Sequence, residues 1–187
     1  METASPPPAV HPTDEPLLAR VLRVYKPSCQ YLKSATVTTD GGLTVATCEF
    51  AIPAPFYIDD TGHFNAVEFN LCYNQMMYYA VAKSVKEGLM APFAHWTMDD
   101  YWQRQLPDFL IVDFHSSFSK GVKVARFHGE IAFRKVRESA GGRNWQPMIV
   151  ADTTCRYWDD EGGRSQGEVR MVIVNPPPRE QPEGSAQ

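Results

Sequence analysis

The chain has no cysteine pair at C-x-x-C spacing and no tight cluster of cysteines. Its four cysteines, Cys29, Cys48, Cys72 and Cys155, are spread along the sequence, and Cys72 falls within a strongly apolar stretch. Zinc sites and disulfide scaffolds require clustered or framework-spaced cysteines, so the sequence predicts neither. We expect no bound metal, and we expect the cysteines to be buried free thiols.

Long hydrophobic runs and phosphate-binding glycine loops are absent as well. No stretch approaches the roughly 18 apolar residues of a transmembrane helix. Prolines follow Met1 closely, where a signal peptide needs an apolar core. A cytoplasmic protein without a membrane partner is therefore expected. Without a glycine-rich phosphate loop, ATP and nicotinamide chemistry have no support, so no cofactor is expected.

The sequence also lacks an excess of positive charge. The net charge is -4 and the isoelectric point is about 5.7. A surface that binds nucleic acid or anionic lipid would give a basic balance, so neither partner is expected.

The residues that are present suffice for one folded unit. A length of 187 residues, of which 43% are hydrophobic and 12% aromatic, predicts one domain with a substantial core. Nine of the fifteen prolines lie near the two ends of the chain. We therefore predict a single domain over residues 16–176, between disordered proline-rich tails at residues 1–15 and 177–187.

The predicted domain begins with a short helix and a hairpin. Residues 17–22 have the spacing of an amphipathic helix, entered through Thr13 or Asp14. Residues 30–39 and 43–51 are rich in threonine, valine and aromatic residues, and the Asp-Gly-Gly sequence between them favours a tight turn. This pattern predicts an antiparallel hairpin.

A long helix and a run of strands follow. Residues 66–85 contain neither proline nor glycine and are apolar on nearly every face, so this helix should be buried on most sides. Thr97 and Asp100 have capping-box spacing, which predicts a second short helix. After Pro107 the hydrophobic pattern has period two and is interrupted by paired glycines, which predicts about four antiparallel strands. The architecture expected is α+β, with a sheet curled around one helix.

Polar and titratable residues concentrate at residues 59–68, where the chain passes from sheet into the long helix. A helix N-terminus presents unpaired N–H groups and a positive dipole, which stabilise an oxyanion or bind a carboxylate. A purely structural interpretation is also open, with Asn65 as N-cap, Glu68 closing a capping box, and Phe64 with Phe69 as a hydrophobic staple. Capping does not explain His63, which is a candidate for proton transfer.

Asn70 and Asn74 form a polar line at i, i+4 on the otherwise apolar long helix. Asparagine has poor helix propensity, so two of them suggest a polar cavity. A buried structural hydrogen-bond network is the alternative, which we favour for Asn70, whereas ligand contact is favoured for Asn74.

The string Asp59-x-x-Gly62-His63-x-Asn65 before a buried helix, followed by antiparallel strands, resembles the hot-dog fold of acyl thioesterases. The fuller string over residues 61–68, with Leu71-Cys72-x-Asn74-Gln75, is similar to the FcoT-like, type III fatty acyl-CoA thioesterase family. The resemblance extends over nearly all of the predicted domain. Its further matches are residues 17–22, Tyr25, residues 96–101 and residues 105–106.

The resemblance implies an activity and a set of pocket residues. Family members in clusters for isonitrile lipopeptides add the amine of glycine to the β-carbon of a (2E)-enoyl thioester on acyl carrier protein, and release a 3-[(carboxymethyl)amino] acid. The pocket residues implied by the family are Tyr25, Tyr57, His63, Asn65 and Asn74, with Glu68 beside them. Asp59 occupies the place of the acid in a different hot-dog thioesterase type, and is expected to be an exposed turn residue.

Conjugate addition and thioester hydrolysis both build negative charge on the thioester oxygen. Backbone N–H groups near residues 65–67 and the Asn74 amide are candidates to hold that oxygen. Glycine must also lose a proton before its amine attacks; His63 is the first candidate base and Glu68 the second. Tyr25 and Tyr57 would orient substrate through their hydroxyls or serve as pocket walls.

The cation for the glycine carboxylate is left open by the sequence. It offers four arginines without a basis for choosing among them: Arg20, Arg104, Arg126 and Arg156.

Three functions remain open at this stage. The chain could be the glycine-adding enzyme, a plain thioesterase for acyl-CoA or acyl carrier protein, or a non-catalytic acyl-binding hot-dog module. The expected partners of the first are glycine and an acyl carrier protein bearing an enoyl thioester. A domain of this kind leaves a sheet edge uncovered, so a homodimer or higher homo-oligomer is also expected.

Overall fold

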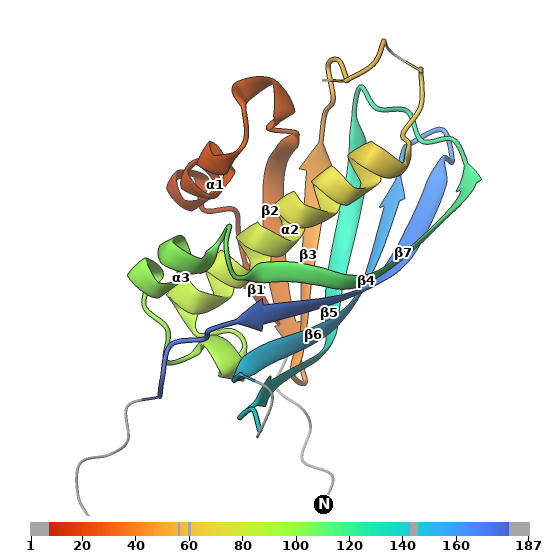
Figure 1. Ribbon diagram of the computed structural model, residues 1–187. Coiled ribbons are helices and arrows are strands. Elements are labelled where there is room, and N and C mark those ends of the chain that lie inside the picture. The colour runs from red at the N-terminus through yellow and green to blue at the C-terminus, as the bar shows by residue number, and fades with distance from the viewer. Residues whose placement is uncertain (1–7, 56, 60, 143–145, 180–187) are drawn as a thin grey trace, which may run out of the picture.

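A computed structural model describes residues 8–55, 57–59, 61–142 and 146–179. One antiparallel sheet of seven strands, in the order β1-β2-β3-β5-β6-β7-β4, curves around the long helix α2 (Figure 1). The strands are β1 Ala9–His11, β2 Leu32–Asp40, β3 Leu43–Phe50, β4 Phe109–Lys120, β5 Phe127–Ser139, β6 Met148–Trp158 and β7 Arg164–Val174. The helices are α1 Glu15–Val21, α2 Ala66–Glu87 and α3 Met98–Arg104, with short 3-10 turns at Leu22–Val24, Pro27–Cys29 and Ala91–Phe93. This is the hot-dog arrangement expected from the sequence.

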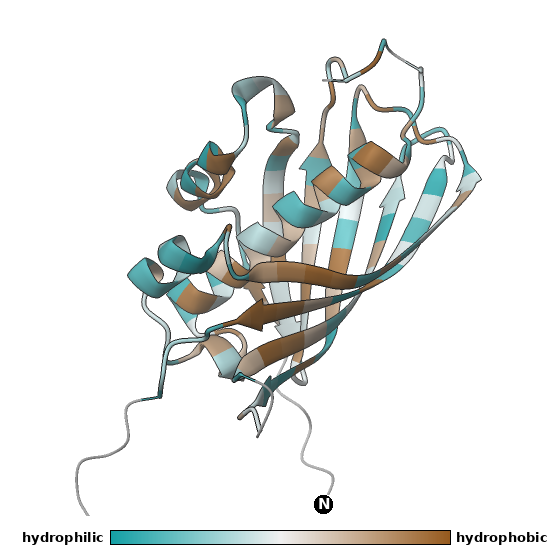
Figure 2. Ribbon diagram, viewed as in Figure 1, coloured by the Kyte–Doolittle hydropathy of each residue, from teal (hydrophilic) through white to brown (hydrophobic). Residues whose placement is uncertain are grey.

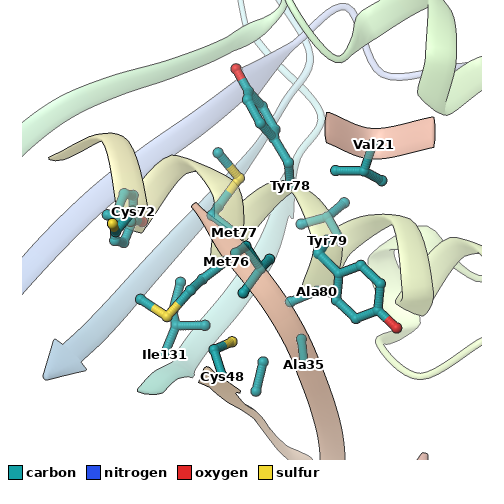
Figure 3. Packing of buried hydrophobic residues seen from close by; sticks show 14 of the residues in the cluster. Val21, Ala35, Cys48, Cys72, Met76, Met77, Tyr78, Tyr79, Ala80 and Ile131 are labelled. Atoms are coloured by element: carbon teal, nitrogen blue, oxygen red, sulfur yellow. The ribbon is translucent and has the colours of Figure 1, made fainter. Parts of the chain in front are cut away.

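Helix α2 is the centre of the hydrophobic core. Its side chains from Cys72 to Val85 are mostly buried, and Met76 points toward Ile131 and Cys48 of the sheet (Figure 3). The helix ends at Gly88, whose left-handed φ of 68° suits glycine. It therefore runs two residues beyond the predicted end at Val85.

Glycine in β5 lets the sheet approach this helix closely. A Cβ atom on Gly129 would lie 2.7 Å from the Phe50 ring and 3.0 Å from both Met76 and Tyr157. Such short contacts must be relieved, so a side chain here would displace the Phe50 and Tyr157 rings and Met76 of the helix.

The predicted secondary structure is confirmed in most of its parts. Asp14 caps α1 by accepting a hydrogen bond from Leu17 N, and Thr97 forms a capping box with Asp100 at the start of α3. The hairpin, the long helix and the four later strands are present. All four cysteines are buried and free, as expected.

The predicted tail boundary at residue 15 is wrong. Residues 9–11 form β1, which pairs with β2 through Ala9 opposite Thr39 and His11 opposite Val37. The ordered region therefore begins before residue 16, because an extended proline-rich segment can still add a strand at a sheet edge. In the predicted C-terminal tail, Arg179 forms a two-point ion pair with Glu138 of β5. Residues 1–7 and 180–187 of the predicted tails lie outside the described residues.

Strand β4 forms one edge of the sheet, with β7 as its neighbour. Its first half is apolar in Figure 2, and its exposed hydrophobic side chains include Leu110, Val112 and Phe118. Long apolar edge strands favour pairing with another chain. Among the described residues, no helix has the length and apolar character needed to cross a membrane.

Candidate functional site

The N-terminus of α2 is organised by Asn65 and a pair of phenylalanines. The Asn65 side-chain oxygen accepts a hydrogen bond of 2.8 Å from Val67 N, which makes Asn65 the N-cap. The rings of Phe64 and Phe69 lie 5.9 Å apart, as a hydrophobic staple requires. Both of these structural predictions are confirmed.

Glu68 does not close the predicted capping box. Its carboxylate accepts a hydrogen bond of 3.2 Å from the Tyr57 hydroxyl instead of from the backbone N–H of Asn65. Only 2% of Glu68 is exposed. The capping-box prediction is therefore wrong for this helix, and the Glu68 carboxylate does not serve as a helix cap.

Three of the predicted site residues form one hydrogen-bonded chain. The Asn65 amide donates to the Tyr57 hydroxyl at 2.6 Å, and this hydroxyl donates in turn to Glu68. Tyr57 lies in the loop between β3 and α2. Burial raises the pKa of Tyr57 despite the opposing effect of the Asn65 bond, so the phenol keeps its proton and stays a donor.

His63 lies beside this chain in a surface hollow of about 370 Å³. The hollow is lined by residues from the start of α2 and the end of β4: His63, Phe64, Asn65, Ala66, Phe118, Ser119, Lys120 and Gly121. The His63 Nδ1 atom is 2.9 Å from the carbonyl oxygen of Thr61. A carbonyl can only accept, so Nδ1 carries the proton and the neutral ring keeps its lone pair on Nε2.

Asn74 and Tyr25 are not part of the chain that joins Asn65, Tyr57 and Glu68. Asn74 donates to Asn70 at 3.0 Å, and Asn70 is exposed while Asn74 is half-buried. The prediction of two buried amides in a polar cavity is therefore wrong, because both lie on the outward side of α2. Tyr25 is partly buried, and its ring centre is 6.5 Å from that of Tyr78.

Asp59 is exposed in the loop before α2, as expected of a turn residue.

Cys72 lies one turn after Glu68 and is fully buried. Burial raises the pKa of the Cys72 thiol well above its ordinary value, so this cysteine is not available as a thiolate nucleophile.

Lys120 is a site residue that sequence reasoning missed. It lines the hollow with His63, and its Nζ donates to the Glu161 carbonyl at 2.6 Å. None of the four arginines considered from the sequence lines the hollow. Arg104, Arg126 and Arg156 pair with Asp100, Glu49 and Glu130, while Arg20 stacks 4.1 Å above Trp102.

The position of Lys120 depends on contacts between distant parts of the chain. The end of β4 meets the start of α2 only through the sheet topology, and no local motif marks it. The hollow therefore combines a helix N-terminus, an imidazole with a free lone pair and one cation. Together these groups can bind a carbonyl oxygen or a carboxylate and accept a proton.

Comparison with known proteins gives consistent matches. Residues 20–173 match the FcoT-like thioesterase domain. The chain is 54% identical over 167 residues to a (2E)-enoyl-[ACP] glycyltransferase of Streptomyces coeruleorubidus, covering 88% of this chain and 99% of that one. It is 35% identical over 164 residues to the protein of the same name from Mycobacterium marinum, covering 87% and 88%.

A solved structure has the same overall architecture at low sequence identity. It is a sigma28-regulated virulence protein from Campylobacter jejuni, with a TM-score of 0.50, 10% identity, and coverage of 85% of this chain and 96% of that one. At this identity the similarity concerns the fold alone.

Proposed function

The chain belongs to the FcoT-like thioesterase family, and from that premise we propose that it is an enzyme that adds glycine to a (2E)-enoyl thioester on acyl carrier protein. The released product would be the 3-[(carboxymethyl)amino] acid. The names of the two glycyltransferase relatives support the substrate class. The observation that carries the proposal is the series of hydrogen bonds from Asn65 through Tyr57 to Glu68. This series lies next to His63 at the start of α2.

The first step forms one bond between nitrogen and carbon. The glycine ammonium gives a proton to His63 Nε2, and the free amine attacks the β-carbon of the enoyl group. The electron pair of the double bond moves to the α-carbon and the thioester oxygen. The α-carbon then takes the proton back from His63, which restores the neutral imidazole. Ala66 lines the hollow, and its N–H at the first helical position has no partner within the helix, so it would stabilise that oxygen.

The second step is hydrolysis of the thioester. Water adds to the carbonyl carbon, the carbon–sulfur bond breaks, and the thiol of the carrier protein is released. The same oxygen becomes negative again, so one set of donors serves both steps. Lys120 is the cation that we assign to the glycine carboxylate, because it lines the hollow.

The complete site in this proposal contains two copies of the chain. Phe118 of β4 forms part of the hollow and is also an exposed residue of the edge strand. A second copy paired along β4 would cover that edge and close the open side of the hollow.

Mass spectrometry with defined substrates tests the function. The protein is incubated with crotonyl-loaded carrier protein, with and without glycine. Formation of 3-[(carboxymethyl)amino]butanoic acid that depends on glycine is the expected result. Release of crotonic acid alone would indicate a plain thioesterase, and no turnover of either kind would indicate an acyl-binding module.

A further inference from the structure

Among the described residues, Glu68 is a buried carboxylate without a cationic partner. Only 2% of the residue is exposed, and its Oε2 atom accepts from the neutral Tyr57 hydroxyl. In the part of the chain that the structure describes, no lysine, arginine or histidine forms an ion pair with it. Buried charges in proteins are normally paired. A cation from outside the chain would therefore be stabilised here.

Tyr31 carries a buried hydroxyl that is unsatisfied among the described residues. Its hydroxyl is fully buried and has no hydrogen-bond partner among the described residues. Buried hydroxyls without partners are rare and destabilising, so a ligand that forms a hydrogen bond with this hydroxyl would be stabilised here. The backbone N–H of Tyr31 donates to Gln75 Oε1 at 3.0 Å, which fixes the residue against the helix.

Gln75, which accepts a hydrogen bond from Tyr31 N, lies on the same face of α2 as Glu68. Glu68 precedes Gln75 by seven residues, about two helical turns, so both project from one face of α2. Burial, then Cys29 and Cys72, and then the Glu68 charge raise the pKa of Tyr31 to about 12. The Tyr31 hydroxyl therefore keeps its proton near neutral pH and offers an oxygen that can also accept a hydrogen bond.

We propose that Glu68 and Tyr31, together with Tyr57, form the subsite that binds the ammonium group of the amino-acid substrate. This inference rests on the proposed function and extends it. An ammonium group is compact, positively charged and carries three N–H donors. The Glu68 carboxylate balances its charge, and the Tyr31 and Tyr57 oxygens accept its remaining hydrogen bonds. Glu68 is thus a substrate-binding residue, and proton removal is left to His63.

Three variants test the subsite. Glu68→Gln removes the charge and Tyr31→Phe removes the hydroxyl. Tyr79→Phe is the matched control, because Tyr79 is also a buried tyrosine but its hydroxyl is satisfied by Asp14 N at 2.8 Å. Binding is followed by ligand-observed NMR with glycine and with methylammonium chloride, which keeps the ammonium group and lacks the carboxylate.

The expected result is selective weakening of both ammonium ligands. The Kd of glycine and of methylammonium should rise at least tenfold in Glu68→Gln and in Tyr31→Phe, and stay within twofold in Tyr79→Phe. In turnover assays, the KM for glycine should rise by the same factor while the KM for enoyl carrier protein is unchanged. Unchanged glycine affinity in the first two variants would overturn the subsite.

Thermal unfolding distinguishes a ligand-binding hydroxyl from a structural one. Without glycine, Tyr31→Phe should leave Tm unchanged or raise it by about 2 °C, because it removes an unpartnered buried group. Tyr79→Phe should lower Tm. If Tyr31→Phe lowers Tm as much as Tyr79→Phe and leaves the glycine KM unchanged, the hydroxyl has a structural partner and the subsite assignment is wrong.

Different experimental results would contradict the subsite and the proposed function. If the wild-type protein binds both ammonium ligands through Glu68 and Tyr31 but forms no glycine adduct with enoyl carrier protein, the subsite stands and the proposed reaction is wrong. If the adduct forms with unchanged glycine KM in both variants, the reaction stands and the subsite is wrong.

Discussion

The Asn65 amide nitrogen donates a 2.6 Å hydrogen bond to the Tyr57 hydroxyl, while the oxygen of the same amide caps α2 through Val67 N. One side chain thus begins the central helix and fixes the phenol that contacts Glu68. The stability of the helix start and the geometry of the site can be separated, because they use opposite ends of one amide.

Asn65→Asp tests this separation. Aspartate is as good an N-cap as asparagine, so the free energy of unfolding should stay within about 0.5 kcal/mol of wild type. A carboxylate cannot donate to Tyr57, so kcat for glycine addition should fall about tenfold or more. Asn65→Ala is the comparison and should lose activity together with about 1 kcal/mol of stability. Full activity in Asn65→Asp would contradict a positioning role for the amide.

His63→Asn tests the base. The asparagine amide nitrogen can replace Nδ1 in the bond to the Thr61 carbonyl, but Nε2 is lost. Glycine addition should slow by about 10²–10⁴-fold, the usual effect of removing a general base. A rate of glycine addition in the variant within twofold of wild type would assign the base elsewhere.

Lys120→Met tests recognition of the glycine carboxylate. Loss of the cation should raise the KM for glycine about tenfold, consistent with one charge-assisted contact. Lys123→Met is the matched control, because Lys123 is three residues away and forms an exposed pair with Glu161. Its kinetics should match wild type. An equal change in both variants would indicate a general effect of surface charge.

Asp159 makes the stability of the fold depend on pH, through hydrogen bonds to backbone that follows the Lys120 end of the hollow. Its carboxylate is buried and accepts hydrogen bonds from the backbone N–H groups of Lys123, Glu161 and Gly163 at 2.6–2.8 Å. Burial alone would raise the pKa of Asp159, but these bonds outweigh it and hold the pKa below the ordinary value. The ionised form therefore stabilises the fold above the ordinary aspartate pKa, and this stabilisation is lost as pH falls through the lower folded-state pKa.

Asp159→Asn should therefore destabilise the protein in a pH-dependent way. At pH 7 the free energy of unfolding should fall by about 2–3 kcal/mol, because an amide nitrogen would face a backbone N–H. Urea unfolding at several pH values should show the difference from wild type narrowing below about pH 4, the ordinary aspartate range. A constant difference across that range would contradict the assigned role of the ionised carboxylate.

Val112→Lys tests pairing along β4. Val112 is 54% exposed on the β4 edge, and a charge there should block contact with a second copy. Sedimentation velocity should show a dimer for wild type and a monomer for the variant, with lower activity. Val10→Lys is the control, because Val10 is 64% exposed on β1 at the opposite edge of the sheet. Dissociation by Val10→Lys alone would move the interface to β1.

The local features of the fold were predictable because local interactions decide them. Asp14, Asn65 and Thr97 were all recognisable as helix starts, and each is an N-cap in the structure. A helix of 22 residues with apolar groups on nearly every face has few arrangements other than burial within a curved sheet. The family string at residues 61–68 then directed attention to the end of that helix where Asn65, Tyr57 and Glu68 are hydrogen-bonded.

The groups that depend on distant contacts were not predictable in the same way. Glu68 has capping-box spacing, but its carboxylate accepts a hydrogen bond from Tyr57 in the preceding loop in place of the N-cap backbone. Tyr31 lies just before β2 and Lys120 is the last residue of β4, so they are far apart in sequence, and no spacing rule relates them to α2. Strand β1 has only three residues within a proline-rich stretch, so its periodicity is too short to detect.

The three residues of β1 have a consequence for the stoichiometry of any assembly. The sheet has one short edge, β1, and one edge of 12 residues, β4. An open-ended filament of sheets would require each copy to offer two matching edges. Edges so unequal in length do not match, so the long edge has only its own counterpart to meet. We therefore propose that association closes at two copies, with β1 as the edge that stays unpaired.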